Sequence, residues 1–85
     1  MREVQTRTKV YGMSSAIRHS RCRGHIDQAE KLKNKGLFHA AAREVVEATK
    51  DAVFTIDLFE VYLLRRDLVE RHGVNWELVL KENKL

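Results

Sequence analysis

The fold of this chain is decided by residues 29–42, which read Ala29-Glu30-Lys31-Leu32-Lys33-Asn34-Lys35-Gly36-Leu37-Phe38-His39-Ala40-Ala41-Ala42. Lysines precede Gly36, and basic side chains are favourable in the last turn of a helix, where the dipole is negative. Glycine then ends the helix, because it adopts left-handed backbone without steric cost. The alanines that follow let two helices approach closely. The stretch therefore predicts an antiparallel helical hairpin, and it holds no catalytic group.

Two helices extend outward from this glycine. The first is expected over residues 26–35, where apolar side chains recur at three-residue steps as Ile26, Ala29 and Leu32. The second is expected over residues 37–52 and has one broad apolar face. That face consists of Phe38, Ala41, Ala42, Val45, Val46, Thr49 and Ala52.

Two more helices are expected after residue 55, and they give an all-α fold built on the hairpin. In the helix predicted over 56–72, apolar residues cover more than half of the circumference, which favours burial on two sides, one of them a candidate dimer surface. They are Ile56, Leu58, Phe59, Val61, Tyr62, Leu63, Leu64, Leu68 and Val69. Gly73 ends this helix. A short helix over about 75–84 then covers the core with Trp76, Val79 and Leu80.

The N-terminal segment has a different character. Residues 1–13 show no sustained period, which predicts a flexible arm or one short strand, and Ser14 or Ser15 is a candidate N-cap. Gly24 argues against one continuous helix over 15–35, because glycine in a helix interior costs about 1 kcal/mol. We therefore expect a basic arm over residues 1–25, partly flexible or forming one short helix, and a helical domain over residues 26–85.

Composition limits the class of protein. The chain has 85 residues, 44% of them hydrophobic, with no proline, four glycines and one cysteine, Cys22. This size allows one small domain, and one cysteine allows no disulfide framework within the chain. No apolar run reaches the roughly 20 residues that a membrane span needs. We therefore expect a soluble cytoplasmic protein with no membrane contact.

Positive charge is concentrated in the arm. Residues 1–25 hold six basic side chains and one acidic, a charge of +5, whereas the whole chain carries +4. Such an arm is suited to phosphate contacts, because arginine binds phosphate oxygens bidentately without reading sequence. The alternative is a solvated tail. The candidate DNA-binding residues are Arg7, Lys9, Arg18, Arg21 and Arg23, with Arg65 and Arg66 as a second contact whose more ordinary role is salt bridging.

Chemistry at a histidine and cysteine cluster is the weaker hypothesis. His19, Cys22 and His25 follow an H-x2-C-x2-H spacing, with His39 as a distant fourth zinc ligand. Three-residue steps drift around a helix, and the neighbouring arginines disfavour a cation. Cys22 also lacks a base and an oxyanion loop. We therefore expect no enzyme, no metal, no cofactor and no small-molecule substrate.

A protein partner is the other candidate. The most hydrophobic predicted helix, over residues 56–72, offers a surface for another protein or for a second copy of the chain. The candidate partner-binding residues are Phe59, Tyr62, Leu63 and Leu64.

Residues 29–42 resemble the PerC-type transcriptional regulators of enteric bacteria and their phages. The shared pattern is A-x-x-L-x-x-K-G-L-[WF]-x-x-A-A, and the paired Arg65-Arg66 stands where the family has a paired arginine. The small ANR regulators have an alanine hairpin of similar spacing. The resemblance covers residues 29–70. Val45 and Val61 replace expected tryptophans, and Leu68-Val69 replaces a cysteine, so apolar character is retained.

The resemblance implies a small non-enzymatic regulator of virulence or horizontally acquired genes. Such a protein acts at promoters directly, through the basic arm, or through a nucleoid or activator protein. In the second case the chain is an interaction module that does not contact DNA itself.

Overall fold

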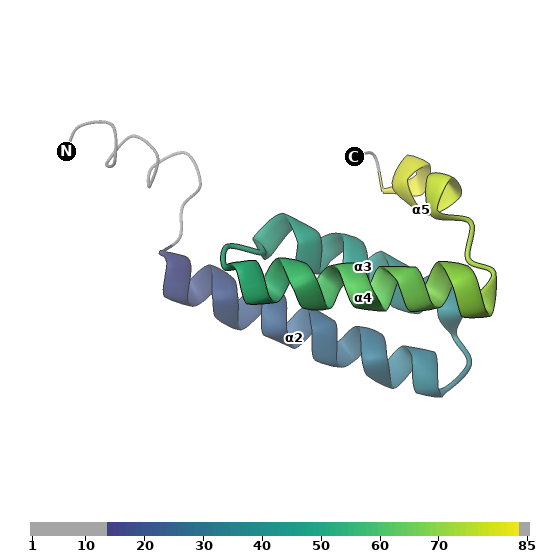
Figure 1. Ribbon diagram of the computed structural model, residues 1–85, viewed down its shortest axis with the longest axis horizontal. Coiled ribbons are helices and arrows are strands. Elements are labelled where there is room, and N and C mark those ends of the chain that lie inside the picture. The colour runs from purple at the N-terminus through teal and green to yellow at the C-terminus, as the bar shows by residue number, and fades with distance from the viewer. Residues whose placement is uncertain (1–13, 84–85) are drawn as a thin grey trace.

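The computed structural model describes residues 14–83, and within this range every regular element is a helix (Figure 1). The all-α fold class is therefore confirmed. The helices are α2 (Ser15–Asn34), α3 (Phe38–Asp51), α4 (Thr55–His72) and α5 (Trp76–Glu82). The first three run side by side along the long axis, and the short α5 lies at one end (Figure 1). The arm or strand predicted for residues 1–13 lies outside the described residues.

Helix α2 begins earlier than expected and passes through Gly24 without a break. The hydroxyl of Ser14 accepts a hydrogen bond from the backbone N–H of Ile17 at 3.3 Å, so Ser14 is the N-cap. Cys22 and Ile26 are buried on either side of the glycine, and their burial offsets its cost of about 1 kcal/mol. The expected break was therefore wrong. Residues 15–25 belong to the helical domain, so the expected boundary after residue 25 falls inside α2.

A tight turn joins α2 to α3 as the sequence predicts. Gly36 has a positive φ of 80°. The N–H of Gly36 donates to the Lys33 carbonyl at 2.9 Å, and that of Leu37 donates to the Leu32 carbonyl at 3.0 Å. These two bonds form a Schellman motif, which satisfies carbonyls at the end of α2 and turns the chain back.

The hairpin core is the set of fully buried or nearly buried side chains that α2 and α3 place against each other. Alanines at this contact bring the two backbones close, so that even small side chains lose all contact with water. The hairpin core consists of Cys22, Ile26 and Ala29 from α2 and Ala41, Ala42, Val45, Val46 and Ala48 from α3.

Helix α4 is buried on one side, not on two. Val61, Leu64 and Leu68 join the core, whereas the opposite side of the helix faces outward. Thr55 is the first helical residue, and Phe54 occupies the cap position without a side-chain bond. Gly73, with φ 68°, ends the helix as expected. The other side, expected as a candidate dimer surface, is not covered by residues 14–83.

Helix α5 covers one end of the core, as expected. The side chain of Asn75 accepts a hydrogen bond from the N–H of Leu78 at 3.1 Å and caps the helix. Val79 is fully buried, and Trp76 and Leu80 pack against the core while partly exposed.

Candidate interaction surface

The exposed side of α4 carries large hydrophobic side chains that no described element covers. We name this surface the outer face of α4. It consists of Ile56, Leu58, Phe59, Tyr62, Leu63 and Val69, each between 36% and 56% exposed. Most of the large hydrophobic side chains exposed in residues 14–83 lie on this helix or directly before it. Large apolar side chains exposed together along one helix are typical of an interaction site.

The outer face follows from helical geometry. Each residue turns the helix by about 100°, so residues that differ by three or four positions share a side. Asp57, Val61, Leu64 and Leu68 share the buried side at such steps. Phe59 lies nearly opposite this side, and its ring is 56% exposed.

Three of the four predicted partner-binding residues lie on this surface, and one does not. Phe59, Tyr62 and Leu63 are exposed. Leu64 is 7% exposed and belongs to the core, so its inclusion was wrong. Apolar character alone did not separate the two sides of this helix, since both are apolar.

Two predicted DNA-binding residues also lie on the exposed side of α4. The guanidinium of Arg65 lies 5.4 Å from the ring centre of Tyr62 and 5.6 Å from that of Trp76. The guanidinium of Arg66 lies 5.8 Å from the Tyr62 ring. Within residues 14–83, neither side chain lies in ion-pair range of a carboxylate. The salt-bridging role expected for them is therefore not seen in this part of the chain.

The three arginines of α2 instead hold the helices together. Arg18 donates to the Lys50 carbonyl at 3.1 Å, and Arg21 lies 3.4 Å from an Asp51 oxygen. Arg23 is hydrogen-bonded to Glu60, and this bond raises the pKa of the guanidinium above its ordinary value. These groups use part of their donor capacity within the fold. The predicted DNA-binding residues Arg7 and Lys9 lie outside the described residues.

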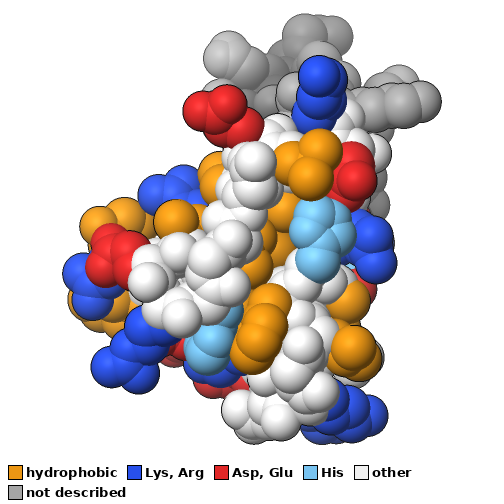
Figure 2. Space-filling model, turned by 90° about the vertical axis from the view of Figure 1, so that its right-hand side faces the viewer, with side chains coloured by type: hydrophobic (Ala, Val, Ile, Leu, Met, Phe, Trp, Pro, Cys, Tyr) orange, Lys and Arg blue, Asp and Glu red, His pale blue; other side chains and the backbone are white. Residues whose placement is uncertain are grey.

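Basic side chains do not gather into one patch at the end of the molecule that carries α5. Figure 2 views this end and shows lysines and arginines around the edge, separated by hydrophobic and acidic side chains. A phosphate-binding surface needs clustered positive charge, which this face lacks.

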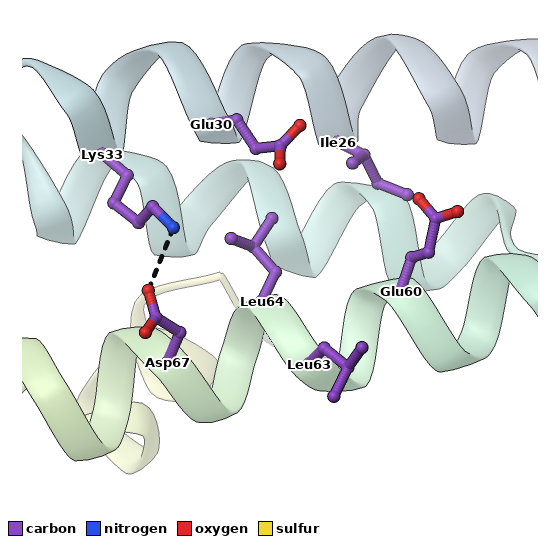
Figure 3. A pocket seen from close by; sticks show the side chains of 7 residues that line it. All are labelled: Ile26, Glu30, Lys33, Glu60, Leu63, Leu64 and Asp67. Carbon is purple, nitrogen blue, oxygen red and sulfur yellow. Dashed lines mark hydrogen bonds and ion pairs between the residues drawn. The ribbon is translucent and has the colours of Figure 1, made fainter.

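A groove of about 230 Å³ runs between α2 and α4, beside the outer face of α4 (Figure 3). Ile26 and Leu64 form its apolar floor, and Leu63 belongs both to this groove and to the outer face. The charged lining residues are Glu30, Lys33, Glu60 and Asp67. The sequence gives no local sign of this groove, because α2 and α4 are far apart in the chain.

One ion pair spans this groove. The Lys33 ammonium lies 3.0 Å from Asp67 Oδ2 (Figure 3). The hydrogen bond from Lys33 holds the pKa of Asp67 below its ordinary value.

The histidine and cysteine cluster is dispersed among separate contacts. His19 Nδ1 lies 2.7 Å from Asp57 Oδ2, and His25 Nδ1 lies 2.8 Å from Glu44 Oε1. Burial raises the pKa of the fully buried Cys22 thiol to about 11, which makes it a poor nucleophile. Residues 14–83 contain no group of three or more potential metal ligands.

The His19 contact ties α2 to the first turn of α4. Asp57 is fully buried there, and its Oδ1 has no hydrogen-bond partner among the described residues. Its position near the N-terminus of α4 stabilises the carboxylate through the helix dipole. The pair therefore orients α4 against α2.

Comparison with protein-family models, curated proteins and solved structures gave no match to this chain. None of the helices in residues 14–83 combines the length and apolar character needed to cross a membrane.

Proposed function

We propose that this chain is a non-enzymatic protein-interaction module that binds a partner helix through the outer face of α4. The observation that carries the proposal is the exposure of Phe59 and Tyr62 on the side of α4 opposite its buried stripe. A helix with one side in the core and large apolar groups on the other suits helix-to-helix recognition. Aromatic residues of this kind dominate the binding energy of many interfaces.

A cytoplasmic regulator of transcription is the wider role that we propose for this module. It is supported by the resemblance of residues 29–70 to PerC-type and ANR-type regulators, in which action through a nucleoid or activator protein is one expected mode. The apolar outer face of α4 favours this mode, because it suits a protein partner better than a phosphate backbone.

Photo-crosslinking tests the interaction module. A benzoyl-phenylalanine replaces Phe59 in one full-length chain and Leu78 of α5, which is 44% exposed, in the control. In a bacterial host, we expect defined crosslinked products from position 59 that are absent from position 78. The same products from both positions, or none from position 59, would contradict the proposal.

Direct DNA contact is the second candidate, and the exposure of Arg65 and Arg66 without a carboxylate partner in residues 14–83 favours it. Its test is duplex-DNA binding by fluorescence anisotropy over a salt series. If both arginines contact phosphates, replacing both by glutamine lowers the slope of log affinity against log salt by about 2. An unchanged slope would contradict a role for these two residues, and no binding by the unaltered chain would remove the candidate.

A further inference from the structure

We infer that the outer face of α4 binds a second copy of this chain, with the two α4 helices antiparallel about a two-fold axis near Tyr62. This inference rests on the proposed function and names its partner.

Spacing along the exposed side matches helix-to-helix packing. Thr55, Phe59, Tyr62, Arg66 and Val69 follow one another at steps of four, three, four and three residues. We name this row the α4 seam. Alternating steps of three and four are the repeat by which two helices interlock their side chains. All five residues are exposed, so a partner helix can lie along the row.

The seam is centred on Tyr62, with Thr55 and Val69 at its two ends. An antiparallel copy therefore sets Tyr62 against Tyr62 of the partner subunit. It also sets the inner residues Phe59 and Arg66 against each other across the axis. The same surface serves both copies, as a closed two-fold interface requires.

Charge along the seam selects the antiparallel orientation. In the half from Thr55 to Tyr62, Asp57 is buried and Glu60 is paired with Arg23 of α2, whereas the other half presents Arg65, Arg66 and Glu70. Parallel helices would place Arg66 beside its own copy, and like charges at close range repel. Antiparallel helices place the Arg66 guanidinium over the partner's Phe59 ring, while it already lies 5.8 Å from its own Tyr62 ring.

Glu70 supports the same orientation. In the antiparallel arrangement it lies near Thr55 at the N-terminus of the partner's α4. Carboxylates are stabilised at this end of a helix by the positive end of its dipole. In a parallel arrangement, Glu70 would instead approach its own copy.

The area of the outer face is sufficient for a modest dimer. Six large side chains that are about half exposed present on the order of 600 Å² of surface, near the roughly 800 Å² per partner of a standard interface. The adjoining groove at Leu63 extends this surface toward α2. A reversible dimer is therefore expected, not an obligate one.

The first measurement is the molar mass of the full chain by analytical ultracentrifugation from 1 to 500 µM, about the range of weak to moderate dimers. We expect a concentration-dependent dimer of the 9.9 kDa chain. Phe59→Arg should weaken the dimer at least tenfold, because it brings two arginines together, whereas Leu78→Arg on α5 should not. A chain that is monomeric throughout, or equal effects of the two variants, would overturn the inference.

Disulfide trapping tests the orientation. In a Cys22→Ala background, Tyr62→Cys should form a covalent dimer by itself. Thr55→Cys and Val69→Cys, at the two ends of the seam, should form a mixed disulfide with each other in preference to disulfides with themselves. Preferential self-disulfides of these two variants would indicate parallel helices and overturn the inference. If Cys22→Ala does not fold, the native Cys22 is kept as the background, because its thiol is fully buried.

The crosslink masses separate this inference from the proposed function. A product from position 59 with twice the chain mass supports the second copy. If the product contains a different protein and the chain is monomeric, the inference fails while the interaction module stands. If no specific product forms and the chain is monomeric, both fail.

Discussion

The hairpin core and the outer face of α4 both consist of apolar residues, yet the first is buried and the second is exposed to solvent. In the hairpin core, small residues such as Ala29 and Ala41 are completely buried. On the outer face, the much larger Phe59 is 56% exposed. The difference shows that close helix contact depends on small side chains, whereas large side chains on a third helix remain available for a partner. Hydrophobicity alone therefore does not indicate where the core lies.

Truncating one side chain on each side of α4 is the strongest test of this difference between buried and exposed apolar residues. Leu68 is fully buried, so Leu68→Ala should lower the free energy of unfolding by about 3 kcal/mol. Leu58 is 51% exposed on the other side, and Leu58→Ala should change it by less than about 0.5 kcal/mol. Urea denaturation at low micromolar concentration measures both. Similar losses would mean that the two sides are not distinct.

Alkaline pH tests whether the hairpin core excludes water from the Cys22 thiol. Burial, together with the charge of Asp57, raises the pKa of the Cys22 thiol from 9.0 to about 11. Between these values the unfolded chain releases the thiol proton while the folded chain keeps it, so stability falls as pH rises. The loss amounts to about 2 kcal/mol between pH 9 and pH 11.

Denaturation at these two pH values measures the alkaline effect, with Cys22→Ala as the control. The cysteine-free variant lacks this thiol titration, so it should lose less stability over the same interval. An identical loss in both proteins would show that the thiol does not carry the effect.

A larger side chain in the hairpin core tests whether α2 and α3 need small residues at their contact. Ala41 is fully buried between helices, so Ala41→Leu should destabilise the fold by about 2 kcal/mol because the helices must move apart. The matched change Ala16→Leu lies at an exposed position of α2 and should be nearly neutral. Thermal unfolding followed by circular dichroism distinguishes them. A tolerated leucine at position 41 would show that close approach is not required.

Two glycines of the hairpin should respond to the same substitution with opposite signs. Gly24 lies inside α2 with open space at its Cβ position, so Gly24→Ala should stabilise the fold by about 0.5–1 kcal/mol. Gly36 has φ +80°, so Gly36→Ala should destabilise it by about 1 kcal/mol. Chemical denaturation of both variants measures the signs. Stabilisation by both would mean that the turn does not need left-handed backbone.

The sequence predicts where helices end better than it predicts which residues of other helices they contact. Gly36 and Gly73 mark the ends of α2 and α4, because the left-handed requirement is local and glycine meets it. Gly24 led to the wrong prediction of a helix break for the opposite reason. Its cost is local, but the buried side chains that offset it contact α3, which no local pattern reveals.

The candidate surface was predicted only in part. Phe59, Tyr62 and Leu63 are exposed, whereas Leu64 is buried, and a helix that is apolar all round carries no signal to separate them. The partners of Arg21 and Arg23 were also missed. Asp51 and Glu60 are distant in sequence, and only the packing of three helices brings them to α2.

The short turn between Asn34 and Phe38 has a consequence for the order of folding. It joins the two helices that share most of the buried contacts, so the chain closes only a small loop before these contacts form. Local contacts of this kind favour early and fast formation. We expect α2 and α3 to form the folding nucleus and α4 to dock later. In hydrogen exchange, the amides of α4 should therefore open more readily than those of the hairpin.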